Sequence, residues 1–257
     1  MGTARGMIYS VLTGAVACGL ALNATRASAD GIPGVVMTDS QYVSDWSGFY
    51  IGGRLGGAGS DVGWKQDVNY FNTLGPIVVG SDSGFSPSGV IGGIIGGGNL
   101  QLGQWIFGAE LSFSGTDLSE TKASPFFPAT DTFTTELDWL ATVEGRIGYT
   151  WNRVFVFGKG GWAGGNASLT LVDNSAGVTA SGETFVDGWV IGGGIEYACW
   201  SSVILGLEYD YVDLSLSEAP SCPNCGTGVG FGSPTISGDI TIQSVMARVS
   251  YLFTPED

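Results

Sequence analysis

The chain contains no histidine, and only nine of its 257 residues are lysine or arginine. The absence of histidine excludes histidine-dependent catalytic triads and dyads and removes the commonest metal ligand. Charged residues make up 13% of the chain, whereas a soluble domain averages about 25%. The net charge of −15 would repel the phosphates of nucleic acid. We therefore expect no catalytic residue, no metal ion, no cofactor and no nucleic acid partner.

Long apolar runs are missing after residue 22, because glycine and charged residues interrupt every later one. Near the start, Arg5 precedes an apolar run over residues 8–22, and Ala27-Ser28-Ala29 has the small residues of a cleavage site. A transmembrane helix needs roughly 20 apolar residues, so this run is too short for an anchor. The pattern predicts a signal peptide over residues 1–29. Its removal takes away two arginines and no acid, which changes the net charge from −15 to −17.

A second interpretation of the same segment is a lipoprotein in which Cys18 carries the lipid. The leucine that usually lies three residues before such a cysteine is replaced here by Ala15. This difference favours a signal peptide that is removed together with an unmodified Cys18.

The chain is instead rich in glycine, with 44 residues, and in aromatic residues, at 12%. Within residues 137–149 the side chains alternate between two faces with the period of a β-strand. The apolar face holds Leu137, Trp139, Ala141, Val143, Ile147 and Tyr149, and the polar face holds Asp138, Thr142, Glu144 and Arg146. A soluble sheet would bury the apolar face, whereas a transmembrane barrel turns it toward lipid and encloses the charges.

Eight segments have the composition of strands, and the gaps between them alternate between short and long. The strand segments are residues 48–59, 89–102, 105–115, 133–149, 154–164, 185–198, 202–216 and 240–253. The short connections are residues 103–104, 151–153 and 199–201, and the long ones are residues 60–88, 116–132, 165–184 and 217–239. In an up-and-down barrel, successive connections lie at opposite ends. The short connections therefore gather at one end and the long ones at the other, as in outer-membrane barrels.

This order predicts an all-β fold, an eight-stranded antiparallel up-and-down transmembrane β-barrel over residues 46–253. Residues 30–45 would form a periplasmic N-terminal linker and residues 254–257 a C-terminal tail. We expect the short turns and both termini in the periplasm and the long loops outside the cell. A soluble lipocalin-like barrel also has eight strands, but it gives no reason for the loop lengths to separate by end.

Charged residues at alternate positions in these strands predict a charge network in the barrel interior, since charges withdrawn from water need partners. The predicted network consists of Arg54, Glu110, Asp138, Glu144, Arg146, Lys159, Glu196, Glu208, Asp210 and Arg248. Phe155 and Phe157 share a face with Lys159. Either a β-bulge or aromatic rings that fill the lumen would explain this arrangement.

Aromatic residues gather at the strand ends, where barrels carry them at the two membrane interfaces. The group expected at the periplasmic interface is Trp46, Phe49, Trp105, Tyr149, Trp151, Trp200 and Phe253. The group expected at the outer interface is Phe113, Trp162, Phe185 and Tyr211.

Six further segments are informative when they are taken in order, namely residues 46–53, 139–149, 160–163, 192–197, 207–211 and 245–253. Together they resemble a family of small eight-stranded outer-membrane β-barrels, the porin-like family of Gram-negative bacteria that includes the outer-membrane immunogenic proteins. The resemblance implies a location in the outer membrane, with its lipid and the barrel assembly machinery as partners. It also implies that the last strand, with Tyr251 and Phe253, is the assembly signal. Such chains usually end in phenylalanine, whereas residues 254–257 follow Phe253 here.

Two motifs resemble enzyme sites. Gly158, Gly160 and Ala163 match the spacing of a dinucleotide loop, but no helix is expected after them to hold a pyrophosphate. The carboxylates between residues 196 and 210 have the composition of a hydrolytic pair. We favour glycines that give interior side chains room and carboxylates that pair with the interior cations.

Cys222 and Cys225 have the spacing of a redox motif but lie in a loop. A possible disulfide between them suits an oxidising compartment. Cys199 would then lie outside this disulfide, and zinc binding by the three cysteines is disfavoured because Cys199 is expected at the other end of the barrel.

The expected function is that of a non-enzymatic outer-membrane barrel that contributes to envelope integrity and presents its loops at the surface. By family resemblance, barrel enzymes of this size use a catalytic histidine, which this chain lacks. One alternative is a narrow porin-like channel, although eight strands leave an interior just wide enough for side chains. Another is adhesion or ligand binding through the loops. The loop residues Trp64, Tyr70, Phe71, Phe126 and Phe127 are candidates for such contacts, but they identify no partner.

Overall fold

The computed structural model describes residues 45–66, 82–123, 129, 131–174, 178–200, 202–218 and 236–254. The strands are β1 (Gly48–Gln66), β2 (Asp82–Phe85), β3 (Ser88–Leu102), β4 (Trp105–Ala123), β5 (Asp131–Trp151), β6 (Val154–Asp173), β7 (Val178–Ala198), β8 (Val203–Glu218) and β9 (Ile236–Phe253). Within these described ranges, no helix is long and apolar enough to cross a membrane. The predicted signal peptide, residues 30–44 of the predicted linker and the possible Cys222–Cys225 disulfide lie outside the described residues.

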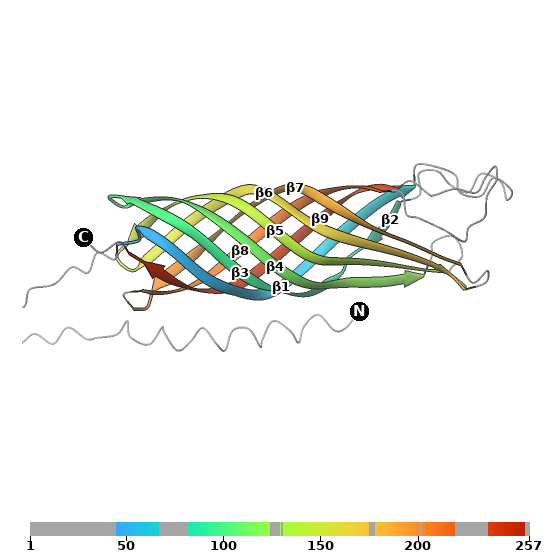
Figure 1. The fold of residues 1–257 in the computed structure, drawn as a ribbon, viewed down its shortest axis with the longest axis horizontal. Coiled ribbons are helices and arrows are strands. Elements are labelled where there is room, and N and C mark those ends of the chain that lie inside the picture. Colours follow the sequence, from blue (N-terminus) through green and yellow to red (C-terminus); the bar gives the residue numbers. More distant parts are fainter. Residues whose placement is uncertain are drawn as a thin grey trace, which may run out of the picture. The chain divides into compact units, whose positions relative to one another are not determined.

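The strands from β3 to β9 follow one another in a single antiparallel sheet, and β1 pairs with both β3 and β9. The β1–β9 pairing runs from Phe49 with Phe253 to Gln66 with Ile236 and closes the ring. Figure 1 shows the tilted strands winding around a common axis. A closed ring leaves no strand edge with unpaired backbone groups. The predicted eight-stranded antiparallel up-and-down barrel is therefore confirmed.

The short strand β2 was not predicted. It takes the place of β3 beside the loop-end part of β1. β1 pairs with β3 as far as Gly59 and with β2 from Val62 onward. Pro87 lies between the two pieces, where its missing N–H cannot join the ladder. The carbonyl oxygen of Pro87 accepts a hydrogen bond from the Ser60 amide at 2.8 Å instead.

Three tight turns join β3 to β4, β5 to β6 and β7 to β8 at one end of the barrel, which we call the turn end. Gly103 and Asn152 in the first two turns have φ angles of 68° and 54°, a conformation that glycine and asparagine adopt more readily than other residues. These turns match the predicted short connections. We call the opposite end of the barrel the loop end.

The strands extend further toward the loop end than the sequence predicted. β4 continues to Ala123 instead of residue 115, and β6 continues to Asp173 instead of residue 164. These extensions are rich in serine, threonine and aspartate, so the composition alone indicated loops. In the barrel they are paired with neighbouring strands, and the backbone hydrogen bonds outweigh the local preference for turns.

Large apolar side chains cover the outer wall of the barrel on the part nearer the turn end. They include Phe49, Ile51, Leu55, Ile94, Phe107, Leu111, Val143, Ile147, Ile191, Ile195, Leu207, Val245 and Val249, all of them exposed. Such a surface is unfavourable in water, whereas a barrel in lipid has an apolar band of this kind.

Candidate functional site: the barrel interior

Nine of the ten charged residues predicted for the interior are buried there, and none is more than 4% exposed. They are Arg54, Glu110, Glu144, Arg146, Lys159, Glu196, Glu208, Asp210 and Arg248. We call these nine residues the charged layer. They come from every long strand except β3, and their side chains alternate with outward apolar ones as the period of two requires.

Two arginines, Arg146 on β5 and Arg248 on β9, share carboxylates in the charged layer. Arg248 forms ion pairs with Glu208 at 2.7 Å, with Glu110 at 2.5 Å and with Glu196 at 3.1 Å. Arg146 forms ion pairs with Glu110 at 3.1 Å and with Glu196 at 2.8 Å. Glu110 and Glu196 therefore each join two guanidinium groups.

The remaining two cations lie beside these arginines in the strand register, with Arg54 on β1 next to Arg248 on β9 and Lys159 on β6 next to Arg146 on β5. Arg54 binds Glu208 at 3.1 Å and Asp210 at 3.3 Å. The Lys159 ammonium lies 3.0 Å from Asp210, 3.3 Å from Glu144, 3.4 Å from Glu208 and 3.8 Å from Glu110. Four cations are thus surrounded by five carboxylates, and every charge has an opposite charge within reach, as buried charges require.

Hydroxyl groups that the sequence prediction did not include fill the gaps in the charged layer. The Tyr50 hydroxyl donates to Glu110 at 2.6 Å, and Arg54 donates to Ser112 at 2.7 Å. Ser112 in turn bonds Thr142 at 2.6 Å. These residues share the inward face of their strands with the charged residues, so the same alternation could have identified them.

Phe155 and Phe157 fill the lumen beside Arg146 and are buried. Their rings stack with centroids 5.4 Å apart, and the Arg146 guanidinium carbon lies 4.4 Å from the Phe157 centroid. The pairing of β5 with β6 runs without a shift through this region. Lumen-filling aromatic rings, rather than a bulge, therefore explain their place on the face of Lys159.

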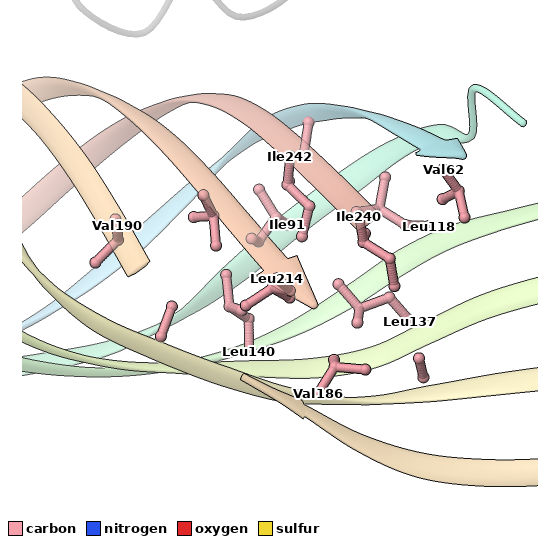
Figure 2. Close-up of a cluster of buried hydrophobic side chains, with 14 of the residues drawn as sticks. Val62, Ile91, Leu118, Leu137, Leu140, Val186, Val190, Leu214, Ile240 and Ile242 are labelled. Atoms are coloured by element: carbon pink, nitrogen blue, oxygen red, sulfur yellow. The ribbon is translucent and has the colours of Figure 1, made fainter. Parts of the chain in front are cut away.

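Apolar side chains close the interior on both sides of the charged layer. The turn-end layer consists of Trp46, Tyr50, Ile106, Phe155, Phe157, Ala198, Ile204 and Leu252. The loop-end layer consists of Ala58, Val62, Ile91, Leu118, Leu137, Leu140, Ala163, Ala167, Val186, Val190, Val212, Leu214, Ile240, Ile242 and Met246. Figure 2 shows the larger side chains of the loop-end layer pointing into the space that the strands enclose. The charged residues therefore occupy only the middle of the interior, between two apolar layers.

Trp46 does not lie at the membrane interface as predicted but inside the turn-end layer, where it is 1% exposed. Its ring centroid lies 5.4 Å from that of Phe155. The Trp46 amide donates to the side-chain oxygen of Gln101 at 2.9 Å. The Trp46 side chain thus turns inward at the mouth of the barrel, which a strand period cannot foresee because Trp46 precedes the strand.

Asp138 is the one predicted network residue that the structure places outside. Leu137 pairs with Ala167 and Trp139 with Asn166, so Asp138 is an extra residue in β5 relative to β6. This bulge reverses the alternation, because one extra residue moves the following side chains to the other face. Leu137 therefore points inward and Asp138 is exposed.

Tyr251 and Phe253 lie on the outer wall at the end of β9, with ring centroids 4.8 Å apart. Their role as an assembly signal stays a prediction. Among the described residues, no group of histidine, cysteine, aspartate and glutamate side chains is arranged to hold a metal ion.

A closed antiparallel barrel with an apolar outer wall and enclosed charges has the structure of an integral membrane β-barrel. The chain belongs to the family described as the outer membrane protein beta-barrel domain, whose model matches residues 15–253. The predicted family and its location in the outer membrane of Gram-negative bacteria are thereby confirmed.

Curated relatives are outer-membrane proteins. The chain is 31% identical over 173 residues to the 31 kDa outer-membrane immunogenic protein of Brucella melitensis biotype 1, which covers 66% of this chain and 71% of that protein. It is 29% identical over 170 residues to the 22 kDa outer membrane protein of Rhizobium leguminosarum bv. viciae, which covers 65% and 64%.

Among solved structures, the outer membrane protease OmpT from Escherichia coli is similar, with a TM-score of 0.51. The match has 8% sequence identity and covers 81% of this chain and 98% of that one. At this identity the likeness extends to the fold alone.

Proposed function

We propose that this protein is a sealed, non-enzymatic barrel that contributes to the integrity of the outer membrane and holds its loops at the surface. The observation that carries the proposal is the charged layer enclosed between two apolar layers. A wall of continuous backbone hydrogen bonds surrounds an interior packed by side chains, so the barrel resists deformation in lipid.

A narrow channel is the second candidate, and the packing of the interior weighs against it. Ions would need a continuous path of water, whereas Phe155 in the turn-end layer and Leu214 in the loop-end layer are fully buried. Apolar constrictions of this kind exclude water and close a pore. Paired ions in the middle of the barrel would also have to separate to let a solute pass.

Hydrolysis by the interior carboxylates is not favoured by their surroundings. A catalytic carboxylate has to reach both water and a substrate, whereas the Glu196, Glu208 and Asp210 side chains are at most 4% exposed. Each of them is paired with at least one arginine. Their surroundings favour a structural role.

Binding through the loops is a further alternative for which the described residues supply no contact. Trp64, expected in a loop, belongs to β1 and pairs with Ser83 of β2. The other aromatic candidates, residues 70, 71, 126 and 127, lie outside the described residues.

Single-channel conductance of refolded residues 30–257 in a planar bilayer tests the sealed interior. We expect no current steps above the background, because the two apolar layers exclude water. Heat-modified gel mobility of the same sample shows that the inserted protein is folded. Reproducible current steps from folded protein would overturn the sealed interior and support the narrow channel.

A further inference from the structure

The outer wall carries a row of aromatic rings near the loop end of the apolar surface, which we call the aromatic arc. It consists of Phe113 on β4, Trp139 on β5, Trp162 on β6, Phe185 and Trp189 on β7, and Tyr211 on β8. Ring centroids lie 5.7 Å apart for Phe113 and Trp139, 6.1 Å for Trp139 and Phe185, and 6.3 Å for Phe185 and Trp162. Trp189 and Tyr211 are 5.5 Å apart.

The aromatic arc covers only one side of the barrel. On β9, β1 and β3, the described outward residues beyond the last large apolar side chain are small or polar. They are Asp239, Thr241 and Gln243 on β9, Gly57, Gly59, Asp61 and Gly63 on β1, and Ser88 on β3. Anchoring at the membrane interface calls for rings around the whole circumference. Anchoring alone therefore does not explain why the rings are restricted to one side of the barrel.

Two exposed carboxylates border the aromatic arc. Asp138, which the bulge turns outward, precedes Trp139 and accepts hydrogen bonds from Asn166 at 3.1 Å and Ser168 at 3.3 Å. Asp187 accepts a hydrogen bond from the Trp162 indole at 3.3 Å. These bonds orient both carboxylates, and each keeps further acceptor positions because a carboxylate accepts about four hydrogen bonds.

The surroundings of the two carboxylates are acidic. Asp117, Glu136 and Glu183 are exposed on the same strands toward the loop end. The Lys122 ammonium, also on β4, lies 3.4 Å from Glu120. A phosphate group would be repelled at this surface, whereas hydroxyl and ammonium groups would find oriented acceptors.

We propose that the aromatic arc, with Asp138 and Asp187, binds the sugar headgroup of a glycolipid whose exposed groups are hydroxyls or amines. Aromatic faces carry partial negative charge and attract the C–H groups on the flat side of a sugar ring. The carboxylates accept hydrogen bonds from its hydroxyl or amine groups. This inference holds whether or not the barrel interior conducts.

The place of the arc favours a lipid-borne sugar over a free one. The arc continues without a gap into the apolar outer wall, where Leu111, Val143 and Ile191 are exposed on the same strands toward the turn end. Acyl chains that lie against this wall would hold the headgroup at the height of the rings. A free sugar would lack these contacts and would bind more weakly.

Tryptophan quenching by brominated lipids tests the proposal on refolded protein in dioleoylphosphatidylcholine vesicles. The probe is monoglucosyl diacylglycerol with brominated acyl chains, compared with brominated phosphatidylcholine. We expect the glycolipid to associate about fivefold more strongly, as hydrogen bonds to two charged acceptors would allow. Asp138→Ala and Asp187→Ala should each reduce this preference, while Asp239→Ala, an exposed acid on β9, should leave it unchanged.

The tryptophans themselves locate the binding site. Trp139→Phe and Trp162→Phe should remove most of the quenching that is specific to the glycolipid, whereas Trp105→Phe and Trp151→Phe, near the turn end, should not. Gel mobility shows that each variant is folded.

Four results would overturn the proposal. The first is equal association of the two lipids with the unaltered protein, and the second is an unchanged preference in both aspartate variants. The third is a stronger preference for brominated phosphatidylglycerol, because its phosphate should be repelled. The fourth is displacement of the glycolipid by free methyl glucoside at equal concentration, which would assign the surface to soluble sugars.

Discussion

The Arg146 side chain shows how a single residue holds the barrel interior together. It pairs with Glu110 and Glu196, donates to the Tyr50 hydroxyl at 2.9 Å and lies over the Phe157 ring. Removing one partner of a buried ion pair leaves the other charge without compensation, and this loss costs more free energy than the pair itself contributes.

Replacing Arg146 by methionine should therefore lower the free energy of unfolding by about 3–5 kcal/mol. Urea titration of the protein folded into vesicles, read by gel mobility, measures this change. A matched control is Lys122→Met, because Lys122 pairs with Glu120 near the surface and is 42% exposed. That pair should contribute about 0–1 kcal/mol. An unchanged midpoint for Arg146→Met would contradict a structural role for the charged layer.

At the scale of the strand, the two faces of β1 differ in the room they leave beside the backbone. A Cβ atom added at Gly56 would meet the Val245 carbonyl oxygen and lie 2.7 Å from the Met246 Cα atom. A Cβ atom added at Gly57 would find its nearest neighbour, the Gly89 carbonyl oxygen, at 4.0 Å. The two adjacent glycines therefore have different reasons to be present, since only Gly56 is required by a close approach of β9.

Gly56→Ala should destabilise the barrel by about 1–3 kcal/mol, the usual cost of overpacking. Gly57→Ala should leave its stability unchanged or raise it by about 0.5–1 kcal/mol, because alanine loses less conformational entropy than glycine in a strand. The same urea titration compares the two variants. Similar losses of stability in both variants would show that the inward face of β1 leaves a side chain no less room than the outward face.

At the scale of the whole molecule, the barrel is longer than a bilayer is thick. A transmembrane strand needs about 9–11 residues, whereas β4 has 19 and β5 has 21. On β4 the outward side chains change from Leu111 and Phe113 to Asp117, Ser119 and Thr121. We therefore expect the loop-end part of the ring, which has its own apolar interior, to stand clear of the lipid.

A cysteine at residue 119 should react with a membrane-impermeant maleimide on intact cells, whereas a cysteine at residue 111 should not. Both positions are exposed on the barrel wall, so only coverage by lipid should make their reactivity with the maleimide differ. The experiment uses Ser119→Cys and Leu111→Cys in a chain whose native cysteines are replaced by serine. Labelling of Ser119→Cys only after the cells are made permeable would reverse the predicted orientation.

The sequence by itself determined the number and order of the long strands and most of the interior charges. Alternation with a period of two separates the faces of a strand wherever one face is polar, which is why Glu144 and Arg146 were placed correctly. The separation of short and long connections then indicates an up-and-down ring. Both signals are local, and both can be read without knowing which residues meet.

Only the tertiary structure decided the rest, because closure of the ring brings distant residues together. Glu110 and Arg248 are 138 positions apart in the chain and bond in the lumen. The bulge at Asp138 depends on the pairing of β5 with β6 and leaves no mark in the alternation of β5 alone. Around Leu214 the enclosed face of β8 is apolar, with Val212 and Leu214, whereas further along the same face Glu208 and Asp210 are charged. Alternation along the strand therefore cannot by itself say which face is enclosed. Packing across the ring selects the enclosed face and places apolar layers on both sides of the charged layer.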